Sequence, residues 1–166
     1  MSVILETPRL LICEFIPEDE ETYLNHFTDE EVCLYLPKRS REERLNIFRT
    51  ALANYATGKL TGTWSMTGKA DHAFIGSCLL RAFNDEPGKL ELGYSMEKKY
   101  WGKGIGTEMA AAMIAYGLAG PGVTAVVAVT VPANIASQKV LEKAGLERRE
   151  NIIRNGEELA FFSSHE

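Results

Sequence analysis

The sequence feature that most constrains this chain is a glycine-rich turn between an apolar strand and an Ala-rich helix. The turn covers residues 101–107 (Trp-Gly-Lys-Gly-Ile-Gly-Thr), after a predicted strand at 89–96 and before a predicted helix at 108–118. Glycines lack the Cβ atoms that would keep a ligand away from the backbone. The N–H groups of the first helical turn lack intrahelical acceptors, and the helix dipole favours negative charge there. The stretch therefore predicts a site for a phosphate or pyrophosphate group.

The spacing of the glycines separates this turn from two common phosphate-binding motifs. A P-loop requires Ser or Thr directly after its Lys, whereas Gly104 follows Lys103 here. A G-x-G-x-x-G dinucleotide turn requires an acidic residue about 20 positions further on, and that window reads Val126-Val127-Ala128 here. A turn that merely joins the strand to the helix remains the structural alternative.

Composition limits the class of protein. The 166 residues suffice for one domain, and the apolar share of 45% and charged share of 25% are ordinary for a soluble globular chain. No apolar run approaches a membrane span, and no signal peptide is recognisable. The three widely spaced cysteines favour reduced thiols and a cytoplasmic location. The histidines form no ligand-spaced cluster, so no metal is expected, and the net charge of −5 argues against a nucleic-acid partner and favours a cationic substrate.

The order of the predicted elements indicates a mixed α/β fold. Strands are predicted at residues 9–15, 61–67, 73–83, 89–96, 123–131, 147–153 and 157–163. Helices with N-terminal signals are predicted to begin near residues 17, 28, 40, 108 and 134. Thr28 with Glu31 and Ser40 with Glu43 form two predicted capping boxes, and Asn155-Gly156 predicts a hairpin turn. No linker or repeat interrupts the chain, so one domain over residues 1–166 is expected.

Local sequence resembles the GCN5-related N-acetyltransferase (GNAT) superfamily, and within it the branch of ribosomal-protein-alanine N-acetyltransferases. Gly104 and Gly106 occupy the glycine positions of the superfamily's Q/R-x-x-G-x-G/A acyl-CoA loop, with Trp101 where Gln or Arg is usual. Further segments that resemble the ribosomal-protein branch lie in chain order at residues 7–12, 17–19, 75–76, 91–94 and 134–146.

The resemblance implies a fold and a reaction. The fold is a mixed, mostly antiparallel, seven-stranded sheet flanked by helices, with a parallel strand pair that splays near Met96 and Val129 at the cofactor site. The implied co-substrate is acetyl-CoA, without a metal. The acceptor is a primary amine, either a protein N-terminal α-amine or a small molecule, which attacks directly in a ternary complex. A monomer or homodimer is expected, with no nucleic-acid or membrane partner.

The resemblance also implies a set of cofactor-binding residues. Backbone amides near Ser95 and Met96 would bond the pantetheine arm like an added strand. Asn134 would face the same arm while also capping its helix. Lys103 and Lys139 would meet CoA phosphates, unless they are ordinary solvated lysines. The full set is Ser95, Met96, Trp101, Gly102, Lys103, Gly104, Ile105, Gly106, Thr107, Asn134, Ser137 and Lys139.

Acyl transfer to an amine also needs a base and an acid. Glu91 is the predicted base, because the amine must lose a proton; pairing with a cation, holding a cationic substrate or ordering a water are the alternatives. Ser137 is the predicted proton donor to the CoA thiolate, with Tyr94 and Tyr116 as alternatives, unless the role of Ser137 is only to bond backbone at the helix cap. Many superfamily members carry Tyr at the position of Leu141, which leaves a non-catalytic acyl-CoA sensor as the alternative function. Tyr35 and Trp64, with Glu91, are predicted to line the acceptor site, unless the two aromatics belong to the core.

Overall fold

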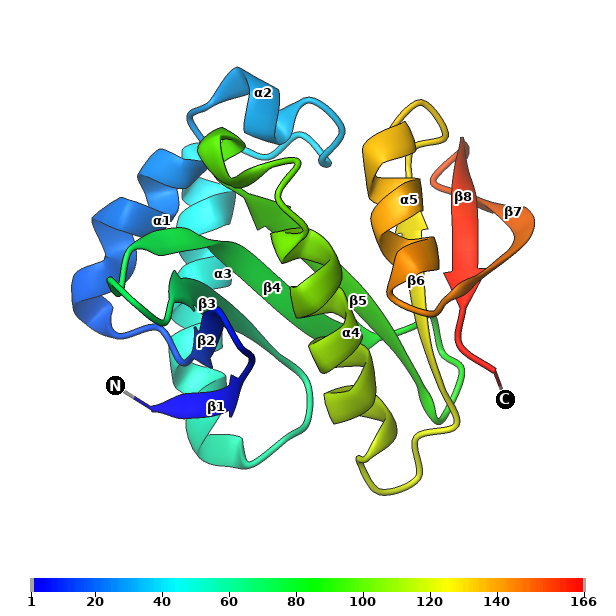
Figure 1. The fold of residues 1–166 in the computed structure, drawn as a ribbon, viewed down its shortest axis with the longest axis horizontal. Helices are drawn as coiled ribbons and strands as arrows, with labels where there is room; N and C mark the ends of the chain where they lie inside the picture. The colour runs from blue at the N-terminus through cyan, green and yellow to red at the C-terminus, as the bar shows by residue number, and fades with distance from the viewer. Residues whose placement is uncertain (1, 166) are drawn as a thin grey trace. The chain divides into compact units, whose positions relative to one another are not determined.

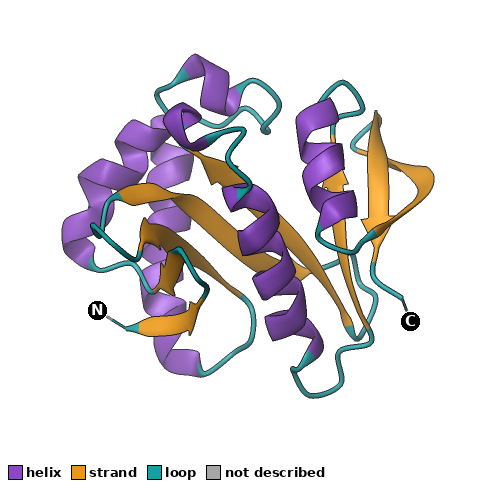
Figure 2. Ribbon diagram, viewed as in Figure 1, coloured by secondary structure: helices purple, strands orange, loops and turns teal. Residues whose placement is uncertain are grey.

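The structure is a computed structural model that describes residues 2–165, and the chain divides into two compact units that are interleaved in sequence. The first unit contains residues 1–79 and 94–102, and the second contains residues 80–93 and 103–166. Strands β4 (Phe74–Ala82) and β5 (Lys89–Met96) each contribute residues to both units. Figures 1 and 2 show the elements of each unit along the chain.

The first unit combines antiparallel strands with short helices. Its strand order is β1 (Val3–Glu6), β2 (Leu10–Cys13), β3 (Gly62–Gly68), then the first part of β4 and the last part of β5. β2 pairs antiparallel with both β1 and β3. The helical segments are η1 (Pro17–Asp19), α1 (Glu20–His26), α2 (Glu30–Cys33), α3 (Arg41–Asn54), η2 (Tyr55–Thr57) and η3 (Lys98–Tyr100).

An aromatic cluster holds the helices of the first unit together. Phe15, Tyr23, Leu24 and Phe48 are all buried, and the ring centroids of Phe15 lie 5.3 Å from Tyr23 and 5.4 Å from Phe48. Edge-to-face aromatic packing of this kind stabilises a core beyond the area it buries. The cluster fixes α1, and therefore the position of His26 in the last turn of that helix.

The second unit contains the parallel strand pair. Residues 89–91 of β5 run parallel to residues 125–127 of β6 (Ala125–Thr130), whose first four residues are buried as the apolar run predicts. β8 (Glu157–Ser163) pairs antiparallel with β6 and with β7 (Glu147–Arg154). Helices α4 (Ile105–Leu118) and α5 (Ile135–Lys143) both pack on β6 and on each other.

Several local predictions are confirmed. Ser40 accepts from the Glu43 backbone N–H while the Glu43 carboxylate accepts from the Ser40 N–H, so α3 begins with a capping box. The hairpin turn between β7 and β8 has Asn155 at φ 51° and Gly156 at φ 77°. Both values match the left-handed conformation that this dipeptide favours.

Two expectations differ from the structure. Among residues 2–165 the strands number eight rather than seven, because Val3–Glu6 pairs with β2 at the sheet edge. A four-residue edge strand is too short to show clear alternation in sequence. The predicted capping box of Thr28 and Glu31 is also wrong: Asp29 caps the short α2 and accepts from the backbone N–H groups of Glu31 and Val32.

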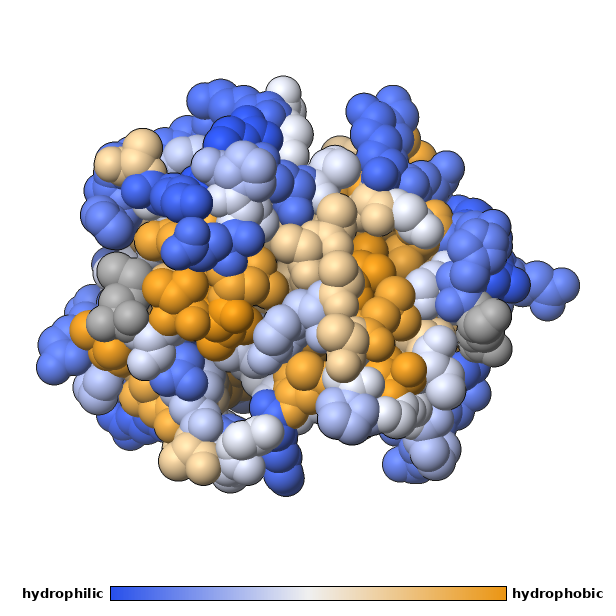
Figure 3. All heavy atoms as spheres, turned by 60° about the horizontal axis from the view of Figure 1, so that its bottom comes forward, coloured by the Kyte–Doolittle hydropathy of each residue, from blue (hydrophilic) through white to orange (hydrophobic). Residues whose placement is uncertain are grey.

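The surface is mixed in hydropathy. On the face drawn in Figure 3, hydrophilic side chains and hydrophobic side chains both reach solvent. Every helix within residues 2–165 is too short or too polar to span a bilayer.

Candidate active site

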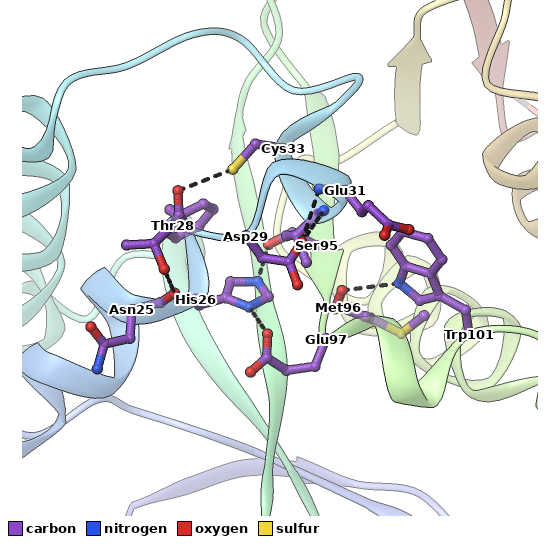
Figure 4. Close-up of polar contacts among 12 residues, drawn as sticks. Asn25, His26, Thr28, Asp29, Glu31, Cys33, Ser95, Met96, Glu97 and Trp101 are labelled. Carbon is purple, nitrogen blue, oxygen red and sulfur yellow. Dashed lines mark hydrogen bonds and ion pairs between the residues drawn. The ribbon is translucent and has the colours of Figure 1, made fainter.

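The glycine-rich turn begins with Trp101, which is bonded back onto the end of β5. Its indole Nε1 donates to the Met96 carbonyl at 3.0 Å (Figure 4), and its backbone N–H donates to the Lys98 carbonyl at 3.0 Å. Trp101 as a whole nevertheless stays 42% exposed. Trp101 therefore anchors the start of the turn, a structural part that the sequence did not reveal.

The turn continues into α4 through a glycine in the left-handed region. Gly104 is the N-cap of α4 at φ 77° and offers no side-chain cap. The first i→i−4 bond of the helix is donated by the Glu108 N–H to the Gly104 carbonyl at 3.1 Å. The N–H groups of residues 105–107 precede that bond and have no intrahelical acceptor. An exposed glycine before such a helix start is the general geometry of an anion site.

The second predicted cofactor segment is the start of α5. The Asn134 side-chain oxygen accepts from the Ser137 backbone N–H at 3.2 Å, so the predicted N-cap is confirmed. Asn134 and Ser137 are half-buried, whereas Lys139 is exposed. Helices α4 and α5, which with their N-caps hold seven of the twelve predicted cofactor residues, pack against each other within the second unit (Figure 1).

The predicted cofactor residues divide between the two units. Ser95, Met96, Trp101 and Gly102 belong to the first unit. The second unit holds Lys103, Gly104, Ile105, Gly106, Thr107, Asn134, Ser137 and Lys139. Each group lies within one unit, and the joint action of these residues on a cofactor stays a prediction.

Glu91, the predicted base, is buried between two arginines of the second unit. Its side chain is 3% exposed, and its Oε2 accepts from Arg81 Nη2 at 2.7 Å. Arg154 donates to the same carboxylate twice, from Nη2 to Oε1 at 2.8 Å and from Nη1 to Oε2 at 3.1 Å. Both carboxylate oxygens are therefore occupied by guanidinium donors.

The electrostatics of Glu91 follow from these contacts. Burial alone would raise the pKa of Glu91, but hydrogen bonds from Arg154 and Arg81 hold that pKa below its ordinary value. A carboxylate with a lowered pKa and engaged oxygens is a weak general base. The geometry favours the cation-pairing alternative, and the role of Glu91 as the base stays a prediction that these contacts do not support.

The two aromatics predicted to line the acceptor site differ in exposure. Tyr35, just after α2, lies on the surface of the first unit. Trp64, on β3, is only 3% exposed and belongs to the buried core of the same unit. Its burial favours the core alternative for Trp64, whereas Tyr35 is accessible to an acceptor.

The first unit also holds a row of polar side chains that the sequence analysis missed. His26, at the end of α1, is 2% exposed, and its Nδ1 lies 2.7 Å from Glu97 Oε2. Its Nε2 lies 2.9 Å from Ser95 Oγ (Figure 4). Ser95 lies on β5 and Glu97 directly follows that strand, so both side chains reach the same imidazole. The histidine precedes them by 69 and 71 residues, and no local pattern links positions so far apart.

Within residues 2–165, no group of three or more His, Cys, Asp and Glu side chains is arranged to hold a metal ion.

Comparison with known proteins gives a consistent set of matches. The model of the Acetyltransferase (GNAT) domain matches residues 9–147. The Bacillus subtilis (strain 168) protein "Uncharacterized N-acetyltransferase YoaA" is 27% identical over 157 residues, which cover 93% of this chain and 88% of that protein.

Solved structures share the fold over nearly the whole chain. A ribosomal-protein-S5-alanine acetyltransferase from Vibrio fischeri is similar with a TM-score of 0.80 at 20% identity, covering 97% of this chain and 95% of that chain. The aminoglycoside acetyltransferase AAC(6')-Ib, solved in complex with coenzyme A, is similar with a TM-score of 0.77 at 15% identity, covering 94% of each chain. At these identities the likeness is one of fold.

Proposed function

The chain belongs to the GNAT family of acetyltransferases, and from this premise we propose that residues 1–166 form one enzyme domain that transfers an acetyl group from acetyl-CoA to a primary amine. The observation that carries the proposal is the start of α4. Gly104 turns the chain at φ 77°, and the N–H groups of residues 105–107 precede the first helical bond. These donors would hold the diphosphate of the co-substrate without interference from side chains.

The thioester supplies an activated acetyl group, and the remaining predicted residues would orient it. Backbone amides near Ser95 and Met96 would bond the pantetheine arm. Asn134 would face the same arm, and Lys103 and Lys139 would approach the phosphates. Direct attack by the amine in a ternary complex requires both substrates to be bound at once.

Ser137 is the proposed donor to the leaving thiolate. It stands in the first turn of α5, half-buried, with its backbone N–H engaged by Asn134. The position four residues on is Leu141, which is buried and cannot donate a proton. We expect Ser137→Ala to lower kcat about tenfold to a hundredfold while the dissociation constant for acetyl-CoA stays near that of the wild type. Equal losses in turnover and in acetyl-CoA affinity would assign Ser137 a binding role instead.

The acceptor is either a protein N-terminal α-amine or a small amine. The similar solved proteins are named as acetylating a ribosomal protein in one case and aminoglycosides in the other. The net charge of −5 favours an acceptor that carries positive charge.

Thiol release from acetyl-CoA tests the proposal. Purified protein would be incubated with acetyl-CoA and, in separate arms, peptides with a free α-amine, polyamines and aminoglycosides. We expect CoA release above the no-acceptor rate in at least one arm, with mass spectrometry locating the new amide.

The alternative of a non-catalytic sensor makes a different prediction from the same assay. Its support is the occupied carboxylate of Glu91 and the leucine at position 141. A sensor would bind acetyl-CoA in calorimetry and release no thiol with any amine. That pair of results would replace the enzyme proposal.

A further inference from the structure

The row formed by Ser95, His26 and Glu97 runs from a half-buried serine through a buried imidazole to a partly exposed carboxylate. Ser95 is half-buried, His26 is 2% exposed, and the Glu97 side chain is 34% exposed. Both ring nitrogens of the buried imidazole are engaged, at 2.9 Å by Ser95 Oγ and at 2.7 Å by Glu97 Oε2 (Figure 4). A histidine between a hydroxyl and a carboxylate is the arrangement that withdraws a proton from the hydroxyl.

The backbone around Ser95 leaves this row little freedom. The Glu97 N–H donates to the Ile75 carbonyl at 2.7 Å, which ties the end of β5 to β4. A Cβ placed on Gly76 would stand 2.0 Å from the Ser95 carbonyl oxygen, so the two strands approach more closely there than any side chain allows. The hydroxyl is therefore held at the imidazole by packing as well as by its own hydrogen bond.

The hydrogen-bond partners fix the direction of the row. An ionised carboxylate only accepts, so Nδ1 of His26 must carry a hydrogen that it donates to Glu97. In a neutral ring Nε2 is then an acceptor, and the Ser95 hydroxyl donates to it. The oxygen of Ser95 keeps lone pairs that can accept a hydrogen from an incoming amine.

The charges that face His26 agree with a neutral ring. Burial lowers the pKa of His26 below its ordinary value, against the opposing effect of Glu97. Arg44 also lowers that pKa, and the carboxylate of Asp29 raises it. A neutral imidazole is the form that can accept a proton.

We propose that Ser95, His26 and Glu97 form a proton relay that takes the proton from the acceptor amine, with the Ser95 hydroxyl as the group that contacts the substrate. The inference rests on the proposed acetyl transfer and supplies the base for which Glu91 is poorly placed. Ser95 is thus a catalytic residue, whereas His26 and Glu97 act through it as positioning residues.

The proton balance of the relay is complete. As the amine nitrogen bonds to the thioester carbon, its N–H becomes acidic and passes to Ser95 Oγ, while the Ser95 proton passes to His26 Nε2. The resulting imidazolium is stabilised by Glu97. The C–S bond then breaks, and the CoA thiolate takes up one proton, equal to the one that the amine lost. His26 passes the proton on Nε2 back through Ser95 Oγ to water, so the ring keeps its hydrogen on Nδ1 and the row returns to its starting state.

Kinetics of three variants test the relay. We expect Ser95→Ala and His26→Gln to lower kcat about a hundredfold with an unchanged dissociation constant for acetyl-CoA, and Glu97→Gln to lower it less. The acidic limb of the kcat/KM profile against pH should disappear in His26→Gln. Ser77→Ala is the matched control, because its buried hydroxyl donates to the Trp64 carbonyl at 3.2 Å and lies outside the row. Wild-type kinetics and pH profile in Ser95→Ala would overturn the relay.

Nitrogen NMR tests the same relay without any change to the row. Of the three histidines, His26 is assigned as the one whose signals persist in His72→Gln and in His165→Gln, because those two residues are exposed. We expect a neutral ring at pH 7 that is protonated at Nδ1. A ring protonated at Nε2, or an imidazolium at that pH, would overturn the relay even if the variants failed to fold.

Two further outcomes separate this inference from others. Mass spectrometry of the enzyme mixed with acetyl-CoA alone should show no acetyl group on Ser95, and an acetyl-serine would replace the relay by covalent catalysis. If the wild type releases no CoA with any amine, the proposed function fails. If the wild type turns over and Ser95→Ala does so equally, only the relay fails.

Discussion

At the scale of single residues, the ion pairs around Glu91 illustrate how burial and charge compete. Taking a carboxylate out of water is costly, and two arginines at 2.7 Å and 2.8 Å offset that cost. Arg81 and Arg154 keep part of their own surface in water, at 49% and 26% exposure, so neither cation is fully desolvated. Glu91 therefore joins β4, β5 and β7 of the second unit through one carboxylate.

Glu91→Gln should destabilise the protein by about 2 kcal/mol at pH 7, because a neutral amide cannot satisfy both guanidinium groups. The pKa of Glu91 lies below its ordinary value of 4.5 in the folded chain. Its contribution is therefore complete above that value and is lost as the pH falls through the folded pKa. Urea unfolding of the wild type and of Glu91→Gln should show a difference in the free energy of unfolding that narrows below pH 4.5.

Glu86→Gln is the control for this experiment. Glu86 pairs with Lys89 at 3.5 Å, and its side chain is 48% exposed. A surface pair of this kind contributes about 0–1 kcal/mol, so the substitution should leave stability nearly unchanged. An equal effect of the two substitutions would contradict a special role for the Glu91 ion pairs.

At the scale of elements, the close approach of β4 to the end of β5 depends on one missing side chain. Gly76→Ala would place Cβ 2.0 Å from a backbone oxygen of Ser95, which no rotamer change can relieve. We expect a loss of about 3 kcal/mol or more in the free energy of unfolding. Gly58→Ala is the control, since a Cβ there meets nothing within 4 Å and the left-handed φ of 69° costs only about 1 kcal/mol. Similar losses in both would show that packing at Ser95 is looser than the structure indicates.

The turn before α4 gives a second prediction at this scale. Gly104→Val should abolish acetyl-CoA binding in calorimetry, because a β-branched residue at φ 77° both strains the turn and fills the space before the helix. Gly122→Val is matched to it: Gly122 has φ 74° and open space around it, in a turn outside the predicted site. Acetyl-CoA affinity that is lost in both, or retained in both, would contradict a specific role for Gly104.

The elements were predictable where their signals are local. The capping box of α3, the N-cap of α5 and the turn at Asn155 depend on residues within a few positions of one another. Arg154, one of the two arginines that bind Glu91, lies 63 residues from it, and His26 lies 69 residues from Ser95. Such pairs are created by strand order and helix packing, so the Glu91 site and the proton relay required the structure.

At the scale of the whole molecule, net charge and family membership both bear on which acceptor the protein uses. A chain of net charge −5 attracts cations over distances limited by salt, with a screening length of about 10 Å at 0.1 M. The family model covers residues 9–147, so family membership defines the class of reaction, while net charge bears on the choice of acceptor.

Salt provides a prediction for that acceptor. For a polycationic amine, kcat/KM should fall about three- to tenfold as the salt concentration rises from about 20 mM to about 200 mM. For an acceptor with a single amine, kcat/KM should fall less over the same range of salt. Steady-state kinetics with both kinds of acceptor would measure the difference. Identical responses would show that net charge plays no part in choosing the acceptor.

Trp101, which its hydrogen bond to the Met96 carbonyl holds at the glycine-rich turn, has a practical use in spectroscopy. The chain has two tryptophans, and Trp64 is sealed in the core while Trp101 keeps 42% of its surface in solvent. Their fluorescence should accordingly differ in wavelength and in accessibility to quenchers. With Trp64 replaced by Phe, the remaining indole would report optically on events at the glycine-rich turn, separately from unfolding of the interior.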